Sequence, residues 1–156
     1  MIASVLAWLL QDFLQVLVTS LILTPEIFLL VSLYKLVSGP TQQRRAAKWI
    51  WFVFCGGVLW DLRWASVPGM SGLLNVAALA AVCWIWDRTP AGGRGTVLFA
   101  AAAGGAHLFS GVVHYLAWAS PGQAAMRTFA IQQLLMIPVL VLLCAIYAFK
   151  ASKTHV

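Results

Sequence analysis

The sequence predicts an all-α, polytopic membrane protein, and its composition carries that prediction. Hydrophobic residues make up 62% of the 156 residues, charged residues make up 9%, and the mean hydropathy is +0.91. Soluble domains are about 45–50% apolar and about 25% charged, so an ordinary soluble domain is excluded. One helical crossing takes about 20 apolar residues. Residues 1–156 therefore have room for a single integral membrane domain of at most six crossings.

Breaks in the apolar pattern divide the chain into six predicted helices. Their ranges are 1–23, 25–37, 47–64, 73–86, 96–119 and 126–149. Thr24, Pro25 and Glu26 are typical of a helix start, because a hydroxyl caps, proline suits the first turn and an acid favours the positive helix end. The second helix would span only about 20 Å, less than a hydrocarbon core of about 30 Å. We therefore expect the first hairpin to reach only part-way across the membrane.

Small residues and one proline predict how the later helices pack. Small side chains run from Ala100 to Gly111, and such residues let helices approach closely in lipid, so we expect the fifth helix to be central. Pro138 frees the carbonyl of Leu134 in the sixth helix. This predicts a kink, with Gln132 and Gln133 as replacement hydrogen-bond partners.

The basic residues predict the orientation. If both termini lie inside, Arg63 and Arg127 lie outside and the other eight basic residues lie inside. Lys and Arg near helix ends are retained on the cytoplasmic side, so the count favours six crossings with both termini in the cytoplasm. The net charge of +6 then follows from topology and from attraction to anionic lipid of the inner leaflet. No nucleic-acid partner is expected.

Polar residues within the predicted helices are candidate functional residues, because a polar group inside a membrane is costly. Gln11, Asp12 and Gln15 lie near the middle of the first apolar run. Gln11 and Gln15 are one turn apart and share a face. They could join this helix to another helix of the chain, which is the favoured interpretation, to a partner chain, or to a proton or ligand.

The fifth predicted helix carries two histidines. His107 and His114 are seven residues apart, or about 10 Å along a helix. This is too far for one metal ion, since zinc-binding helices use an i, i+4 pair such as H-E-x-x-H. We expect hydrogen-bonded packing histidines, with His114 near the outer surface beside Tyr115 and Trp118. No metal and no cofactor are expected.

An acid and a base, Asp61 and Arg63, lie near the end of the third predicted helix. Residues two apart point to nearly opposite sides of a helix. Arg63 is therefore expected to reach the outer interface between Trp60 and Trp64, while Asp61 faces inward. Asp61 would lock the following turn by accepting hydrogen bonds there. The candidate donors are Ser66, Ser71 and Asn75.

An intramembrane aspartate dyad is the enzymatic alternative, because two close carboxylates share one proton. We place Asp12 near mid-membrane, Asp61 near the outer end and Asp87 at the inner end, so that no two lie level. The sequence has no phosphate-binding glycine loop, and no serine or cysteine nucleophile at helical spacing from a histidine. No enzymatic activity is expected.

Two stretches resemble the rod shape-determining protein MreD family. "TPEIFLLVSLYKLVSG" looks like the second helix of that family, and "GGVLWDLRWASVPGMSGLLNVAALAAVCWIW" is similar to its third and fourth helices. In the family a glycine stands four residues before an aspartate and another eight residues after it, as Gly57, Asp61 and Gly69 do here. Ala65 departs from the glycine that the family often has. The resemblance covers about residues 25–86.

The resemblance implies a non-enzymatic scaffold subunit of the bacterial elongation machinery in the inner (cytoplasmic) membrane. MreD proteins bind MreC, and through it they connect the actin-like MreB with the peptidoglycan polymerase RodA and its transpeptidase partner. On this interpretation, residues of the first helix, of the start of the second helix, and of the third helix with the turn after it have partner-binding or structural roles. They are Gln11, Asp12, Gln15, Glu26, Gly57, Asp61, Arg63 and Gly69.

A substrate-binding S component of an energy-coupling-factor vitamin transporter is the alternative, because the MreD family is similar to S components in fold. The resemblance thus implies an S-component-like bundle. An S component would couple to its energising module through an AxxxA contact, for which Ala3 and Ala7 are suited. It would also keep an outward cavity. The candidate lining residues are Trp60, Asn75, His114, Trp118 and Arg127, with Asp61 and Arg63 beside them.

Overall fold

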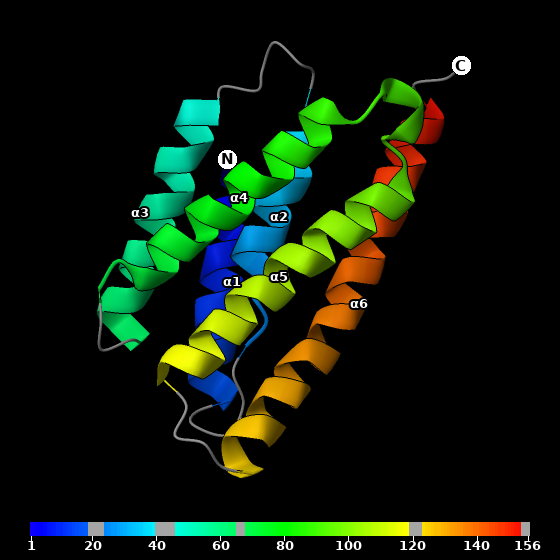
Figure 1. Cartoon of the computed structure of the whole chain (residues 1–156). Coiled ribbons are helices and arrows are strands. Elements are labelled where there is room, and N and C mark those ends of the chain that lie inside the picture. Colours follow the sequence, from blue (N-terminus) through cyan, green and yellow to red (C-terminus); the bar gives the residue numbers. More distant parts are fainter. Residues whose placement is uncertain (19–23, 40–45, 65–67, 119–122, 154–156) are drawn as a thin grey trace.

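The computed structural model describes residues 1–18, 24–39, 46–64, 68–118 and 123–153, and within these ranges the chain is an all-helical bundle without strands (Figure 1). The helices are α1 (Ile2–Val18), α2 (Ile27–Val37), α3 (Ala46–Trp64), α4 (Met70–Arg88), α5 (Thr96–Trp118) and α6 (Gln123–Lys153). A short 3-10 turn, η2 (Ala91–Gly93), lies between α4 and α5. The predicted all-α class is confirmed.

Consecutive helices run in opposite directions, which gives the bundle two chemically different ends (Figure 1). Basic side chains gather where α2, α4 and α6 end and where α3 and α5 begin. We call this the basic end and define it by Lys35, Lys48, Arg88, Arg94 and Lys150. The opposite end is where α3 and α5 end and α4 and α6 begin, and it is marked by Arg63, Gly69 and Arg127.

Among the described residues, three helices are long and apolar enough to cross a membrane. They are α4, Thr96–Leu116 of α5 and Met126–Ser152 of α6. α1 and α2 are shorter apolar helices. With 11 residues α2 spans about 16 Å, which confirms the predicted short second helix. The chain therefore has the character of a membrane protein.

The central helix is α2, and not the fifth helix as the small-residue stripe predicted. Leu29, Leu30 and Leu33 of α2 have no exposed surface, and α2 contacts α1, α3, α4, α5 and α6. A helix that is apolar on all sides is buried on all sides. On α5, by contrast, Gly105 has no neighbouring atom within 4 Å of where a Cβ would lie. A small-residue stripe thus marks one close contact of a helix and does not show how many faces are covered.

Three helices, α2, α4 and α6, have bounds that differ from the predicted ones by two residues or more. α2 begins at Ile27, because Glu26 (φ −75°, ψ 66°) is not yet helical and its side chain makes no capping hydrogen bond. α4 begins at Met70, directly after Gly69, which takes the left-handed conformation (φ +93°) that favours glycine. α6 extends beyond both predicted bounds. Residues 19–23 and 119 of the predicted helices lie outside the described residues.

Two glycines allow α3 and α4 to pack backbone to backbone. A Cβ on Gly57 would lie 2.4 Å from the Cα of Gly72, and a Cβ on Gly72 would lie 2.8 Å from the carbonyl oxygen of Phe54. Neither position accepts a side chain without a backbone shift. The hairpin of α3 and α4 is therefore a closely packed unit.

Aromatic rings fill the core near the basic end. Phe99 and Tyr147 stack with their centroids 5.0 Å apart, and Trp86 meets Tyr147 edge to face at 6.0 Å. The Tyr147 hydroxyl donates to the carbonyl oxygen of Arg94 at 2.9 Å. These contacts tie the ends of α4 and α6 to the start of α5.

Candidate functional site

A cavity of about 530 Å³ lies among the helices toward the opposite end. Its volume falls within the range of about 300–1,000 Å³ that is usual for small-molecule sites. Six aromatic side chains form much of its wall: Trp8, Phe28, Trp60, Trp64, Tyr115 and Phe129. Polar side chains of α1, α4, α5 and α6 and of the segment before α2 reach it as well. They are Gln11, Gln15, Thr24, Glu26, Ser71, Asn75, His114, Thr128 and Gln132.

Two glutamines of α1 bind the amide groups at the start of α2. Gln11 Oε1 accepts a hydrogen bond from the Phe28 amide at 2.9 Å, and Gln15 Oε1 accepts from the Thr24 amide at 3.1 Å and the Thr24 hydroxyl at 2.8 Å. The first amides of a helix have no partner within the helix. The prediction that these glutamines join the first helix to another part of the chain is confirmed. Their use here removes the reason for assigning them to a partner chain.

Asp12 lies beside the end of α3, whereas the sequence predicted it at a different level from Asp61. Its Oδ2 is 3.0 Å from a guanidinium nitrogen of Arg63, and its Oδ1 accepts from the Trp64 indole at 2.8 Å. Asp61 precedes Arg63 by two residues, or about 3 Å of helix rise. Asp12 and Asp61 are therefore at similar depth. The error arose because the sequence does not show how far α1 is displaced lengthwise against α3.

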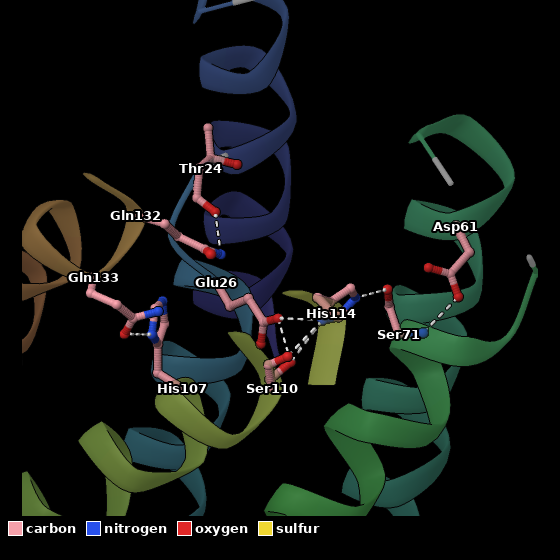
Figure 2. Close-up of polar contacts among 9 residues, drawn as sticks. All are labelled: Thr24, Glu26, Asp61, Ser71, His107, Ser110, His114, Gln132 and Gln133. Carbon is pink, nitrogen blue, oxygen red and sulfur yellow. Dashed lines mark hydrogen bonds and ion pairs between the residues drawn. The ribbon is translucent and has the colours of Figure 1, made fainter. Parts of the chain in front are cut away.

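Asp61 holds the start of α4, as Figure 2 shows. The side chain is fully buried, and its Oδ2 accepts a hydrogen bond from the Ser71 amide at 2.8 Å. This confirms the prediction that an amide after the third helix binds Asp61, although Ser71 belongs to the first turn of α4 and not to a loop. Asn75, the other candidate donor, lines the cavity. Ser66 lies outside the described residues.

A line of polar contacts leads from Asp61 to Glu26 (Figure 2). The Ser71 hydroxyl lies 3.0 Å from His114 Nε2, and His114 Nδ1 lies 2.9 Å from the carbonyl oxygen of Ser110. The Ser110 hydroxyl donates to Glu26 Oε1 at 2.5 Å. Side chains of α3, α4 and α5 are thereby joined to the residue that precedes α2. Ser110 stands one helical turn before His114, with its hydroxyl 3.4 Å from His114 Nδ1, so the expectation that no serine lies at helical spacing from a histidine was wrong.

The second histidine has a separate environment. His107 is fully buried, and its Nδ1 lies 3.2 Å from Gln133 Oε1. Gln132 donates to the Thr24 carbonyl oxygen at 3.4 Å. Both glutamines thus bind other elements, and the prediction that they compensate for Pro138 was wrong. No group of three or more His, Cys, Asp or Glu in the described part of the chain is placed to hold a metal ion.

The predicted lining of the cavity was right for three residues. Trp60, Asn75 and His114 line it. Arg127 is exposed and lies outside the lining, since its position at the start of α6 points it away from the bundle. The Trp118 side chain lies outside the described residues.

Other predicted site residues are placed around the cavity. Gly57 lines it, whereas Asp61, Arg63 and Asp12 do not. Most of the lining was not assigned from the sequence, and its one acidic residue is Glu26, which was interpreted as a helix-start residue. The carboxylate reaches the cavity because α2 begins between the other helices and not at the bundle surface.

No protein-family model, no curated protein and no solved structure matches this chain. Its own residues therefore carry the functional argument.

Proposed function

We propose that this chain is a non-enzymatic scaffold subunit of the bacterial elongation machinery, similar to MreD and located in the inner (cytoplasmic) membrane. The observation that supports this proposal most strongly is the hairpin of α3 and α4. The residues of the MreD-like register take part in it: Gly57 gives the close helix contact, Asp61 binds the Ser71 amide, and Gly69 forms the left-handed turn before α4. A pattern that builds one rigid unit is suited to holding a partner.

The outward face of this hairpin is where we place the partner, MreC. Leu59 and Leu62 of α3 are 56% and 68% exposed. Arg63, next to them, is fixed by Asp12 through their ion pair and lies over the Trp64 ring, 5.5 Å from its centroid. Apolar side chains beside a fixed charge suit a single membrane-spanning helix of the partner. Through MreC the scaffold would connect MreB with RodA and its transpeptidase partner.

Six crossings with both termini in the cytoplasm are part of the proposal. The alternating helices and the gathering of cations at the basic end support it, because cytoplasmic ends retain Lys and Arg. Single cysteines replacing Lys48 and Arg127 in a variant lacking Cys55, Cys83 and Cys144 provide the test. A membrane-impermeant thiol reagent applied to intact cells should label the cysteine at 127 and not the one at 48. Labelling at 48 would contradict the orientation.

Capture of the complex tests the scaffold role. The tagged chain, extracted from native membrane in mild detergent, should recover MreC, as identified by mass spectrometry. Asp61→Ala should lower that recovery several-fold, because the start of α4 loses its acceptor. Asp87→Asn is the matched control, since Asp87 is exposed at the far end of α4. Equal recovery of MreC with Asp61→Ala and with the control would remove Asp61 from the partner site.

The cavity supports a second candidate, an S-component-like substrate-binding subunit. A concave site with converging polar groups is the usual form of a small-molecule site. The same capture experiment separates the two candidates. Recovery of an ATPase module without MreC would favour transport and would overturn the scaffold proposal.

A further inference from the structure

The charge within the cavity is negative. Among the residues that line it, Glu26 is the only acid, and none is Lys or Arg. The Glu26 side chain is 14% exposed, so it reaches the cavity, while its Oε2 is buried without a hydrogen-bond partner among the described residues. Asn75 Oδ1, on the α4 wall, is likewise buried without one. Two acceptor oxygens of lining residues are therefore left without a donor.

The contacts of Glu26 involve one of its two oxygens, Oε1, which faces His114 and Ser110. The Ser110 hydroxyl donates a hydrogen bond but carries no charge. His114 Nδ1 lies 3.8 Å from Glu26 Oε1 but only 2.9 Å from the Ser110 carbonyl oxygen. The second oxygen, Oε2, is buried without a hydrogen-bond partner among the described residues. A buried carboxylate oxygen without a donor is costly, so a cationic donor in the cavity would stabilise it.

The aromatic wall favours the same ligand chemistry. The rings of Trp60 and Trp64 lie 6.2 Å apart, and both line the cavity together with Trp8. An aromatic face attracts a cation electrostatically, most strongly for tryptophan, and aromatic cages of this kind recognise organic ammonium groups. Arg63, which lies over the Trp64 ring, is paired with Asp12. No Lys or Arg is among the lining residues to bind an anion.

We propose that this cavity binds a small organic ammonium ion, with the ammonium group against the Glu26 carboxylate and the rest of the molecule between the tryptophans. The inference goes beyond the scaffold role and does not rest on it. The ammonium group could belong to a free amine or to a lipid headgroup, because both present the same chemistry to Glu26.

Three probes of one shape and different charge test the proposal. Benzylamine, benzyl alcohol and benzoate are a cation, a neutral molecule and an anion at neutral pH. The full chain, purified in an uncharged detergent, is titrated with each while tryptophan fluorescence and the midpoint of thermal unfolding are recorded. Benzylamine should bind at least about tenfold more tightly than the other two, a difference of about 1.4 kcal/mol. Equal binding of the three probes, stronger binding of benzoate, or no binding of benzylamine would overturn the proposal.

Variants locate the site. Glu26→Gln keeps the size of the side chain and should weaken benzylamine binding about tenfold or more, whereas the control Asp87→Asn should leave it unchanged. Trp60→Leu should weaken benzylamine binding several-fold. This variant tests the site independently if Glu26→Gln does not fold. Unchanged binding in a folded Glu26→Gln variant or in Trp60→Leu would overturn the assignment.

Nanodiscs distinguish the two sources of the ammonium group. Benzylamine is titrated into the chain in phosphatidylethanolamine and in phosphatidylglycerol discs. Weaker apparent binding in phosphatidylethanolamine would support a headgroup as the occupant, because the lipid amine competes. Equal tight binding in both would support a free amine. Absence of binding in both would overturn the proposal.

Discussion

The two ends of the bundle use their polar groups differently. Near the basic end, rings are stacked around Tyr147, whose hydroxyl is bound to Arg94, and Lys150 donates to the Ser38 carbonyl at 2.8 Å across the bundle. Near the opposite end, α3 and α4 pack closely but the other helices leave a cavity, and oxygens of Glu26 and Asn75 have no hydrogen-bond partner among the described residues. The comparison indicates that packing at the basic end maintains the fold. At the opposite end, the cavity and its unpartnered oxygens are available to bind a ligand.

The largest effect should come from removing a ring at the basic end. Phe99 is almost fully buried between Tyr34 and Tyr147. Phe99→Ala should lower the free energy of unfolding by about 3 kcal/mol, the low end of the range for soluble cores, because helices in lipid lose packing more than burial from water. Benzylamine affinity of the folded fraction should stay unchanged. Thermal unfolding and titration measure the two quantities, and a loss of affinity without a loss of stability would break the comparison.

A methyl group between α3 and α4 should have the next largest effect. Gly57→Ala forces a backbone shift and should cost about 1–3 kcal/mol. Gly105→Ala is the matched control in α5, where no atom lies within 4 Å of the added Cβ. It should be neutral or stabilising by up to about 1 kcal/mol, since alanine is the better helix former. If both variants unfold at the same temperature, the close packing of the hairpin is not what stabilises it.

Removal of one glutamine should have a moderate effect. Gln11→Leu leaves the buried Phe28 amide without its acceptor and should cost about 1–2 kcal/mol. Phe13→Leu, at a lipid-facing position of the same helix, is the control and should cost less than about 0.5 kcal/mol. Unfolding midpoints measured at one detergent concentration give both values. A Gln11→Leu variant as stable as the control would show that another group or water serves the amide.

The smallest effect should be that of Arg127→Ala. Arg127 is exposed and does not line the cavity, so the change in unfolding free energy should stay within about 0.5 kcal/mol. Benzylamine affinity should be the same as in the unchanged chain. Weaker binding in this variant would show that the binding site includes Arg127 at the start of α6.

Helix class, helix order and the inward direction of Asp61 were predictable from sequence because they depend on local patterns. Breaks such as "SGP" and "TPAGG" interrupt apolar runs whatever the packing. A carboxylate near a helix end, with a turn following it, has amides close by along the chain, which is why the prediction of a turn donor to Asp61 was right.

The arrangement of the site could not be predicted, because its contacts join residues that are far apart in the sequence. Gln11 caps a helix that begins 16 residues later, and Asp12 meets Arg63 across 51 residues. Both contacts follow from the lengthwise offset of α1, α2 and α3, which is decided by side-chain packing. The same offset brings Glu26 into the cavity. Sequence reasoning identified these polar residues as candidates and could not pair them.

The cap that Gln11 provides for α2 bears on how this helix could be accommodated in a bilayer. A helix of 11 residues is too short to cross alone, and its first amides would be costly in hydrocarbon without a partner. The Phe28 amide finds its acceptor on α1. Burial of the start of α2 in an apolar medium therefore depends on α1.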